Sequence, residues 1–285
     1  MAWYSTSISN FFRLKFLLIF CIALLGLGIF YFANMQKQKT RPDFGPPKTI
    51  KVLGKEKVKY PQDYTIVMVG DSMTETLGNS DELKKFLSDY YPGKSFEILN
   101  YGFGATNILS VMDRITKDTE RGRKFRSIES IAYELILLES FGENPLSQYP
   151  LNEGLQRQTQ ELDKIVGVLK ETNPKGKIAF VASISPNKLI FAQNQVNLSS
   201  EKKAQWVEER IAYIKNHILY AQSHNIPIIN VFEKSLSENG DGDPEYISTD
   251  DYIHPSPKGI IFISKEIADY IYKNNLLGSG LFNSN

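Results

Sequence analysis

Short runs of apolar residues recur along most of the chain, and a longer segment of mixed character follows each of them. The runs are residues 64–70 (YTIVMVG), 95–100 (SFEILN), 133–140 (YELILLES), 177–183 (KIAFVAS) and 226–232 (IPIINVF). Their length and composition predict buried strands. In the segments between them, apolar residues have helical spacing, as at Leu155, Leu162, Ile165, Val166 and Leu169, and at Ile211, Ile214, Ile218 and Tyr220.

Strand and helix segments that alternate in this way predict an α/β domain with a parallel sheet. Right-handed crossovers place helices on both faces of such a sheet, which gives a three-layer α/β/α arrangement. Ligands of these sheets bind beyond the carboxyl ends of the strands. The residues that directly follow each apolar run are therefore the first candidates for function.

One apolar stretch near the N-terminus is much longer than the others. Residues 16–35 (FLLIFCIALLGLGIFYFANM) carry no charge and lie between basic residues. This length predicts a transmembrane helix preceded by a short tail, residues 1–15. No small-x-small cleavage site follows it, so we expect an uncleaved single-pass anchor and not a signal peptide. The flanking charges do not fix the orientation, and we expect the following domain to be extracytoplasmic.

The remaining chain divides by composition into a linker, one domain and a tail. Residues 36–60 are rich in Lys and Pro, which predicts an extended linker, although "TIKVLG" and "EKVKY" within it could pair as a small ribbon. No Pro/Gly-rich gap or repeat interrupts residues 61–275, so we expect a single domain there. Residues 276–285 predict a flexible tail.

Composition and charge exclude several classes of function. Lys and Arg number 33 and Asp and Glu 32, so no basic field favours nucleic acid as a partner. The single cysteine, Cys21, lies in the N-terminal apolar stretch, which leaves no disulfide framework, cysteine nucleophile or cysteine metal site in the domain. With no phosphate-binding glycine loop and no histidine metal pair, we expect no cofactor and no metal.

The first predicted strand ends at Gly70-Asp71-Ser72. A serine that begins a helix at this edge points its hydroxyl into the crevice, where its own N–H and the helix dipole face any anion that forms. The alternative is that Ser72 only caps the helix and Asp71 is a turn residue.

A second polar cluster, residues 248–259 (STDDYIHPSPKG), precedes the last predicted helix. Asp251 and His254 are three positions apart, so the carboxylate can orient an imidazole that acts as a base for a serine. Asp250 is the alternative carboxylate. The other two histidines, His217 and His224, lie in helical segments, where we expect surface or packing roles.

Together, Gly-Asp-Ser and Asp-x-x-His resemble the first and last motifs of the GDSL-like, or SGNH, hydrolases, a likeness that covers most of residues 64–273. In LNYGFGATN (99–107) the resemblance implies Gly104 as a backbone donor to the oxyanion hole, with Gly102 in reserve because this loop is one residue short. In LLESFGENP (137–145) it implies Asn144 as the side-chain donor, with Pro145 in place of the usual Asp.

The resemblance implies the SGNH hydrolase fold, whose five-stranded parallel sheet is flavodoxin-like, and a serine esterase anchored in the membrane by its N-terminal helix. The substrate would be a small-molecule, glycan or lipid ester, with envelope glycans and lipids favoured by the placement. The implied catalytic triad is Ser72, His254 and Asp251. The implied oxyanion hole consists of Ser72, Gly104 and Asn144, and Asp71 is a supporting acid that braces the turn.

Other functions remain open at this point. The same triad would serve an acyltransferase, and the same fold would serve a non-catalytic surface-binding protein. Glu139 and Glu143 suggest a glycosidase pair, but the presence of Gly-Asp-Ser and Asp-x-x-His disfavours it. Residues 238–246 (ENGDGDPEY) suggest a calcium loop, although a solvated turn is favoured because the full ligand spacing is missing. The apolar residues 189–191 either line an acyl pocket or pack over the sheet edge.

Overall fold

The computed structural model describes residues 48–52 and 55–278. The predicted tail of residues 1–15, the predicted transmembrane helix of residues 16–35 and the first part of the predicted linker lie outside these residues. Among the helices that are described, none has the length and apolar character needed to cross a bilayer.

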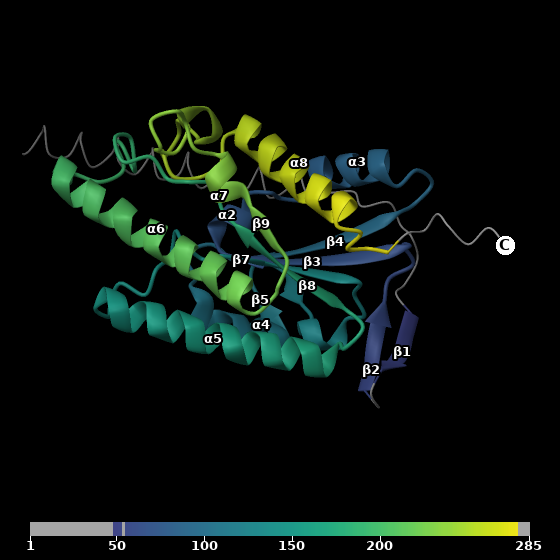
Figure 1. Ribbon diagram of the computed structural model, residues 1–285. Coiled ribbons are helices and arrows are strands. Elements are labelled where there is room, and N and C mark those ends of the chain that lie inside the picture. Colours follow the sequence, from purple (N-terminus) through teal and green to yellow (C-terminus); the bar gives the residue numbers. More distant parts are fainter. Residues whose placement is uncertain (1–47, 53–54, 279–285) are drawn as a thin grey trace, which may run out of the picture. The chain divides into compact units, whose positions relative to one another are not determined.

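Five parallel strands form the central sheet of the domain (Figure 1). They are β3 (Tyr64–Gly70), β4 (Phe96–Gly102), β7 (Leu135–Glu139), β8 (Lys177–Ala182) and β9 (Ile228–Asn230). Their order in the sheet is β4-β3-β7-β8-β9. The second strand therefore lies on one side of the first and the later strands on the other, which is the flavodoxin-like order. The prediction of a three-layer α/β/α fold with five parallel strands is confirmed.

Helices cover both faces of this sheet (Figure 1). One face carries α2 (Ser72–Glu75), α3 (Asp81–Tyr90) and α8 (Pro257–Lys273). The other carries α4 (Val111–Thr116), α5 (Leu151–Thr172) and α6 (Ser200–Ser223). The shorter elements are α7 (Val231–Lys234), the 3₁₀ turns η1 (Ile108–Ser110), η2 (Ile128–Ser130) and η3 (Pro244–Tyr246), and the hairpin of β5 (Thr119–Glu120) with β6 (Lys124–Phe125).

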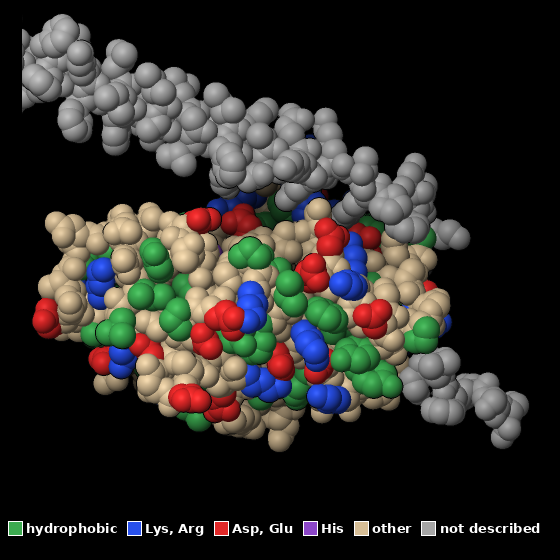
Figure 2. All heavy atoms as spheres, turned by 90° about the horizontal axis from the view of Figure 1, so that it is seen from above, with side chains coloured by type: hydrophobic (Ala, Val, Ile, Leu, Met, Phe, Trp, Pro, Cys, Tyr) green, Lys and Arg blue, Asp and Glu red, His purple; other side chains and the backbone are tan. Residues whose placement is uncertain are grey.

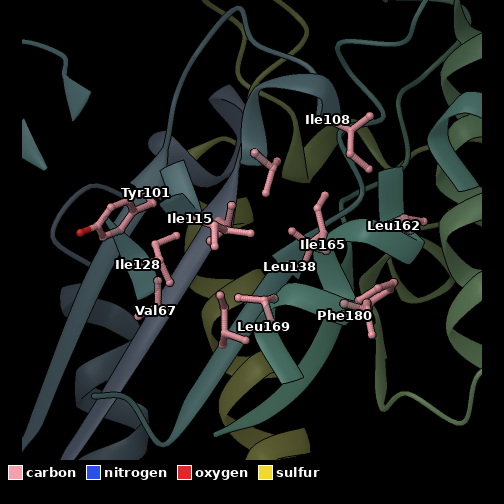
Figure 3. Packing of buried hydrophobic residues seen from close by; sticks show 14 of the residues in the cluster. Val67, Tyr101, Ile108, Ile115, Ile128, Leu138, Leu162, Ile165, Leu169 and Phe180 are labelled. Atoms are coloured by element: carbon pink, nitrogen blue, oxygen red, sulfur yellow. The ribbon is translucent and has the colours of Figure 1, made fainter. Parts of the chain in front are cut away.

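Side chains of each central strand alternate between two hydrophobic cores. Val67 and Val69 of β3 belong to the core under α4 and α5, whereas Ile66 and Met68 belong to the core under α3 and α8. Figure 3 shows Val67 in the first of these cores, together with residues of β7, β8 and α5. Because both faces of the sheet are covered, both sets of positions are apolar, and the strands appear in the sequence as unbroken apolar runs.

The two longest helices follow their predicted apolar stripes. In α5 the side chains of Leu162, Ile165 and Leu169 are buried against the sheet. In α6 Ile214 and Ile218 are buried in the same way, next to β8 and α7. Burial of each such side chain contributes about 1.5–3 kcal/mol relative to exposure, which is what holds these helices on the sheet.

The ends of the described chain are attached to the domain. The predicted ribbon exists: β1 (Lys48–Val52) pairs antiparallel with β2 (Lys55–Lys59), and the N–H of Ala132 donates to the carbonyl of Val58 at 2.8 Å. At the other end, Leu276 and Leu277 are buried in the core under α3 and α8. The first residues of the predicted tail therefore pack on the domain, because their apolar side chains gain more from burial than from remaining free.

The face that α8 presents to solvent carries basic and acidic side chains side by side (Figure 2). Asp269 of α8 pairs with Lys265 and Lys273, and Glu266 pairs with Lys234. This mixture gives that face no extended field of one sign, in keeping with the balanced charge of the sequence.

Candidate active site

The first three motifs of the sequence meet at the carboxyl edge of the sheet, and the fourth brings His254 close enough for the charges of Asp71 and Glu143 to act on it. Gly70, Gly102 and Glu139 are the last residues of β3, β4 and β7, and these three strands are neighbours. At Gly102 an added Cβ would lie 2.2 Å from the backbone nitrogen of Glu75, so a glycine is required where α2 crosses the end of β4. This close approach sets the position of α2 and of the serine that begins it.

Ser72 is the first residue of α2, and Asp71 is its N-cap. The Oδ1 atom of Asp71 accepts a hydrogen bond from the N–H of Met73 at 2.8 Å. The capping role considered for Ser72 thus belongs to its neighbour. The Ser72 side chain is half-buried at the sheet edge and is not needed to cap the N-terminus of α2.

Asp71 is fully buried and joins two loops of the site. Its Oδ2 atom accepts from the Nδ2 group of Asn144 at 2.9 Å, and its N–H donates to Oε2 of Glu139 at 3.1 Å. Burial raises the pKa of Asp71, although the donors of Asn144 and Met73 oppose the shift. Asp71 therefore braces the turn, as the resemblance implies, and also holds Asn144 beside the turn that carries Ser72.

Glu139 and Glu143 are both buried, but each has its own partners. Glu139 accepts from the hydroxyl of Ser140 at 2.8 Å and the N–H of Phe141 at 2.9 Å, and burial together with the charge of Asp71 raises its pKa well above the usual range. Glu143 accepts from Nε of Arg210 at 3.1 Å, and burial raises its pKa to about 7 against the effect of that cation. Both carboxyl groups hold the loop after β7 in place.

His254 is hydrogen bonded to Asp251. The distance from Nδ1 of His254 to Oδ2 of Asp251 is 2.5 Å, and Oδ1 of Asp251 accepts from the N–H groups of Ile253 at 2.8 Å and His254 at 3.0 Å. Burial opposes the charge, but these donors and His254 lower the pKa of Asp251 to about 2. The bond to Asp251 in turn raises the pKa of His254. Asp250, the alternative, is exposed.

Gly104 lies beside the serine. A Cβ on Gly104 would be 3.5 Å from Cβ of Ser72, so the two residues are in contact range. The N–H of Gly104 donates to Oε2 of Glu75 at 3.1 Å, whereas the N–H of Gly102 donates to Oδ1 of Asn100 at 2.8 Å within its own strand. Of the two glycines, Gly104 is the one whose N–H faces the region of Ser72.

Arg114 of α4 is a residue that the sequence analysis missed. Its side chain is buried, and its Nη1 donates to the carbonyls of Gly70 at 2.6 Å and Tyr101 at 2.9 Å, where β3 and β4 end. Its Nη2 donates to the hydroxyls of Thr106 and Ser110. One signal was available, because Arg114 has the helical spacing of the apolar face formed by neighbouring α4 residues.

The other predicted polar features have structural partners of their own. His217 is buried and stacks on Phe180 with a centroid distance of 4.2 Å, and burial lowers its pKa to about 3. His224 stacks on Tyr220. In residues 238–246 the acidic side chains have different partners and do not converge on one point. Asp241 accepts from the N–H of Lys188, Asp243 caps η3 and Glu245 pairs with Lys258. No cluster of three or more metal-binding side chains occurs within residues 48–52 and 55–278.

Of the apolar residues 189–191, Phe191 has the packing role and Leu189 is exposed. Phe191 is buried in a small core with Val207, and Trp206 and Ile253 pack against it. Leu189 is 81% exposed. The segment thus packs α6 against the loop that carries His254, while Leu189 faces solvent.

Comparison with known proteins places this fold and site in a family. The family model of the GDSL-like lipases/acylhydrolases matches residues 66–267. A lipase/acylhydrolase from Enterococcus faecalis is 15% identical, with 74% of this chain and 96% of that chain covered and a TM-score of 0.51. A GDSL-like lipase from Bacteroides thetaiotaomicron is 13% identical, with 74% and 89% covered and a TM-score of 0.50.

An acetyl xylan esterase is also similar, at 13% identity, with 74% of this chain and 98% of that chain covered and a TM-score of 0.50. At such identities these structures show a common fold. No curated protein matches the chain. The family model spans most of the sequence and includes all four motifs, and the chain therefore belongs to the GDSL-like lipases/acylhydrolases, hydrolases that act on ester bonds.

Proposed function

We propose that this protein is a serine esterase whose catalytic triad is Ser72, His254 and Asp251. The observation that carries the proposal is the 2.5 Å bond between Nδ1 of His254 and Asp251 at the sheet edge where Ser72 begins α2. This bond fixes the imidazole tautomer, so that Nε2 is the nitrogen that accepts the proton of the serine hydroxyl. The charge of Asp251 then stabilises the imidazolium.

The oxyanion hole of the proposed enzyme consists of the N–H groups of Ser72 and Gly104 and the amide of Asn144. The Nδ2 group of Asn144 has two hydrogens, so its bond to Asp71 leaves one for the substrate oxygen. These donors stabilise the negative charge that forms when Ser72 attacks the ester carbonyl.

The reaction then proceeds in two halves. In the first, the tetrahedral intermediate collapses, the leaving alcohol takes the proton from His254, and the acyl group stays on Ser72. In the second, water attacks the acyl-enzyme while His254 takes up its proton. The carboxylic acid leaves and the Ser72 hydroxyl is restored.

The substrate we propose is an ester of a small molecule, a glycan or a lipid. The predicted anchor of residues 16–35 supports a substrate in the cell envelope, where an outward-facing domain would meet acetylated glycans and lipid esters. The similarity to an acetyl xylan esterase is compatible with glycan deacetylation. Transfer of the acyl group to a sugar hydroxyl would use the same triad.

The test compares the full-length protein with Ser72→Ala on p-nitrophenyl esters from acetyl to long acyl chains. Ser88→Ala, at an exposed serine of α3, is the matched control. We expect wild type and Ser88→Ala to hydrolyse the esters and to be labelled by a fluorophosphonate, and Ser72→Ala to do neither. The acyl-chain profile then separates a deacetylase from a lipase. Absence of both turnover and labelling in the wild type would show the proposal to be wrong.

A further inference from the structure

The carboxylate of Glu75 occupies the proposed oxyanion donor of the resting enzyme. Its Oε2 atom accepts from the N–H of Gly104 at 3.1 Å. Glu75 follows Ser72 by three residues, so both side chains lie on the same side of α2. A Cβ on Gly104 would lie 2.5 Å from this oxygen and 3.5 Å from Cβ of Ser72. The carboxylate thus lies where a substrate carbonyl would bind.

The other side of the same glycine is held by a cation. Nη2 of Arg121 donates to the carbonyl of Gly104, and the guanidinium lies 5.5 Å from the ring centroid of Phe103. Gly104 is therefore fixed by an arginine on its carbonyl and contacted by a carboxylate on its N–H. Movement of Glu75, and not of the glycine, is the simpler way to free the donor.

An ester carbonyl is a poor competitor for a donor that already serves a carboxylate. Hydrogen bonds to an ionised acceptor are about twice as strong as those to a neutral one. Glu75 is exposed, however, so a substrate group that donates hydrogen bonds can reach its carboxylate. A hydrogen-bond donor on the alcohol part of the ester would replace the bond that Glu75 loses when it leaves the N–H of Gly104.

We propose that Glu75 determines specificity by releasing Gly104 to esters whose alcohol part carries free hydroxyl groups near the ester oxygen. Such hydroxyls donate to the Glu75 carboxylate, and the N–H of Gly104 becomes available to the oxyanion. An ester without hydroxyl groups must displace the Glu75 carboxylate from Gly104 without offering it a new hydrogen bond. An ester with an anionic alcohol part is repelled by the charge of Glu75. This inference rests on the proposed esterase function.

The kinetic test uses a pair of substrates that differ only in donors: a mono-O-acetyl methyl glycoside, and the same compound with its free hydroxyls methylated. The full-length wild type should prefer the hydroxyl-bearing ester. In Glu75→Ala we expect this preference to fall about tenfold or more, and kcat/KM for the methylated ester and p-nitrophenyl acetate to rise severalfold, because a charged hydrogen bond no longer has to be broken.

The control is Glu171→Gln, which removes an exposed charge near the end of α5, at the opposite edge of the sheet. It should behave as wild type. An unchanged preference in Glu75→Ala, or a fall in its kcat/KM for p-nitrophenyl acetate, overturns the inference. A wild type without any esterase activity would instead contradict the proposed function. The failure of the inference and the failure of the proposed function therefore give different results.

A second measurement does not depend on turnover. The amide proton resonance of Gly104 should have a different chemical shift in Glu75→Ala than in the wild type, because the hydrogen bond to the carboxylate is lost. Addition of the methyl glycoside product should shift this resonance in the wild type only. A Gly104 amide resonance that is unchanged by Glu75→Ala also overturns the inference.

Discussion

At the scale of single residues, Asp251 sets the pH range in which His254 can act as a base. The hydrogen bond that Nδ1 of His254 donates to Asp251 raises the pKa of His254 above its ordinary value of 6.5, while Asp251 stays ionised because its own pKa is about 2. Protonated His254 cannot accept the proton of Ser72. We therefore expect kcat/KM to decrease as the pH falls, with a midpoint above 6.5.

Asp251→Asn removes the charge and should move this midpoint to lower pH, with a loss in kcat of roughly 10⁴-fold. Asp250→Asn, at the exposed neighbour, is the control and should leave the pH–rate profile unchanged. An unshifted midpoint in Asp251→Asn would contradict the assignment of the triad carboxylate.

Asn144 is the second residue whose removal has a defined effect. Asn144→Ala deletes an oxyanion donor, so kcat should fall about 10²–10³-fold with little change in KM. Asp71 also loses the donor at 2.9 Å, and a modest decrease in Tm should accompany the kinetic loss. Steady-state kinetics and thermal unfolding of the same sample measure both effects. Full activity of the folded variant would remove Asn144 from the proposed hole.

At the scale of elements, Arg114 connects α4 to the ends of two strands. Its Nη1 donates to the carbonyls of Gly70 and Tyr101. Its Cζ atom lies 4.4 Å from the ring centroid of Phe103. These bonds join the strand end before Ser72 to the loop that carries Gly104. Arg114 is therefore a positioning residue, since it acts on the reaction through the two loops.

We predict that Arg114→Met destabilises the fold by about 3 kcal/mol, because the buried carbonyls of Gly70 and Tyr101 each lose a charged donor. Arg114→Lys keeps the charge but not the planar fork of donors. The lysine variant should remain folded and label with a fluorophosphonate more slowly, with kcat reduced more than KM is changed. Equilibrium unfolding and labelling rates test this pair. A lysine variant that is less stable but labels at the wild-type rate would leave Arg114 with a structural role only.

At the scale of the whole molecule, the sheet joins two hydrophobic cores into one domain. Leu169 of α5 is buried in one core and Ile271 of α8 in the other. Each change to alanine should cost about 2–5 kcal/mol. Because side chains of the same strands belong to both cores, each variant should shift the same single unfolding transition. The double variant should lose the sum of the two free energies of unfolding. Two separate transitions in chemical denaturation would show that the faces unfold independently.

The sequence predicted the strands and the motif residues because both depend on local pattern. The observed strands fall within one or two residues of most of the apolar runs. Asp71, beside Ser72, lies close enough to His254 for its charge to act on the imidazole. The capping role was assigned to Ser72 as an alternative, yet Asp71 has it. Choosing between these two neighbours required the backbone geometry of the turn.

The contacts of Glu75, Arg114 and Arg210 could not be predicted in the same way. Each pairs with a residue distant in sequence: Glu75 with Gly104, Arg114 with Gly70, and Arg210 with Glu143. Charged residues in helical segments usually belong to a solvated face, and the sequence analysis made no prediction for these three side chains. Their partners become neighbours only when the sheet assembles.

The buried carboxyl groups behind the site have a consequence for folding itself. Burial raises the pKa of Glu143 from 4.5 to about 7 and that of Glu139 well above its usual range, so the native chain keeps protons on these acids that the unfolded chain has lost. Folding near pH 6 therefore takes up protons. The stabilisation from Glu143 is complete below pH 4.5 and is lost as the pH rises through about 7.

Calorimetry in buffers of different ionisation enthalpy would detect this exchange. Unfolding should release protons to the buffer, so the observed enthalpy at pH 6 should vary linearly with the ionisation enthalpy of the buffer. The slope should decrease in Glu143→Gln. An equal slope in the wild type and in Glu143→Gln would mean that Glu143 is ionised in the folded protein. The chain thus enters its native state with protons gained on these acids and one given up at His217, whose pKa burial lowers to about 3.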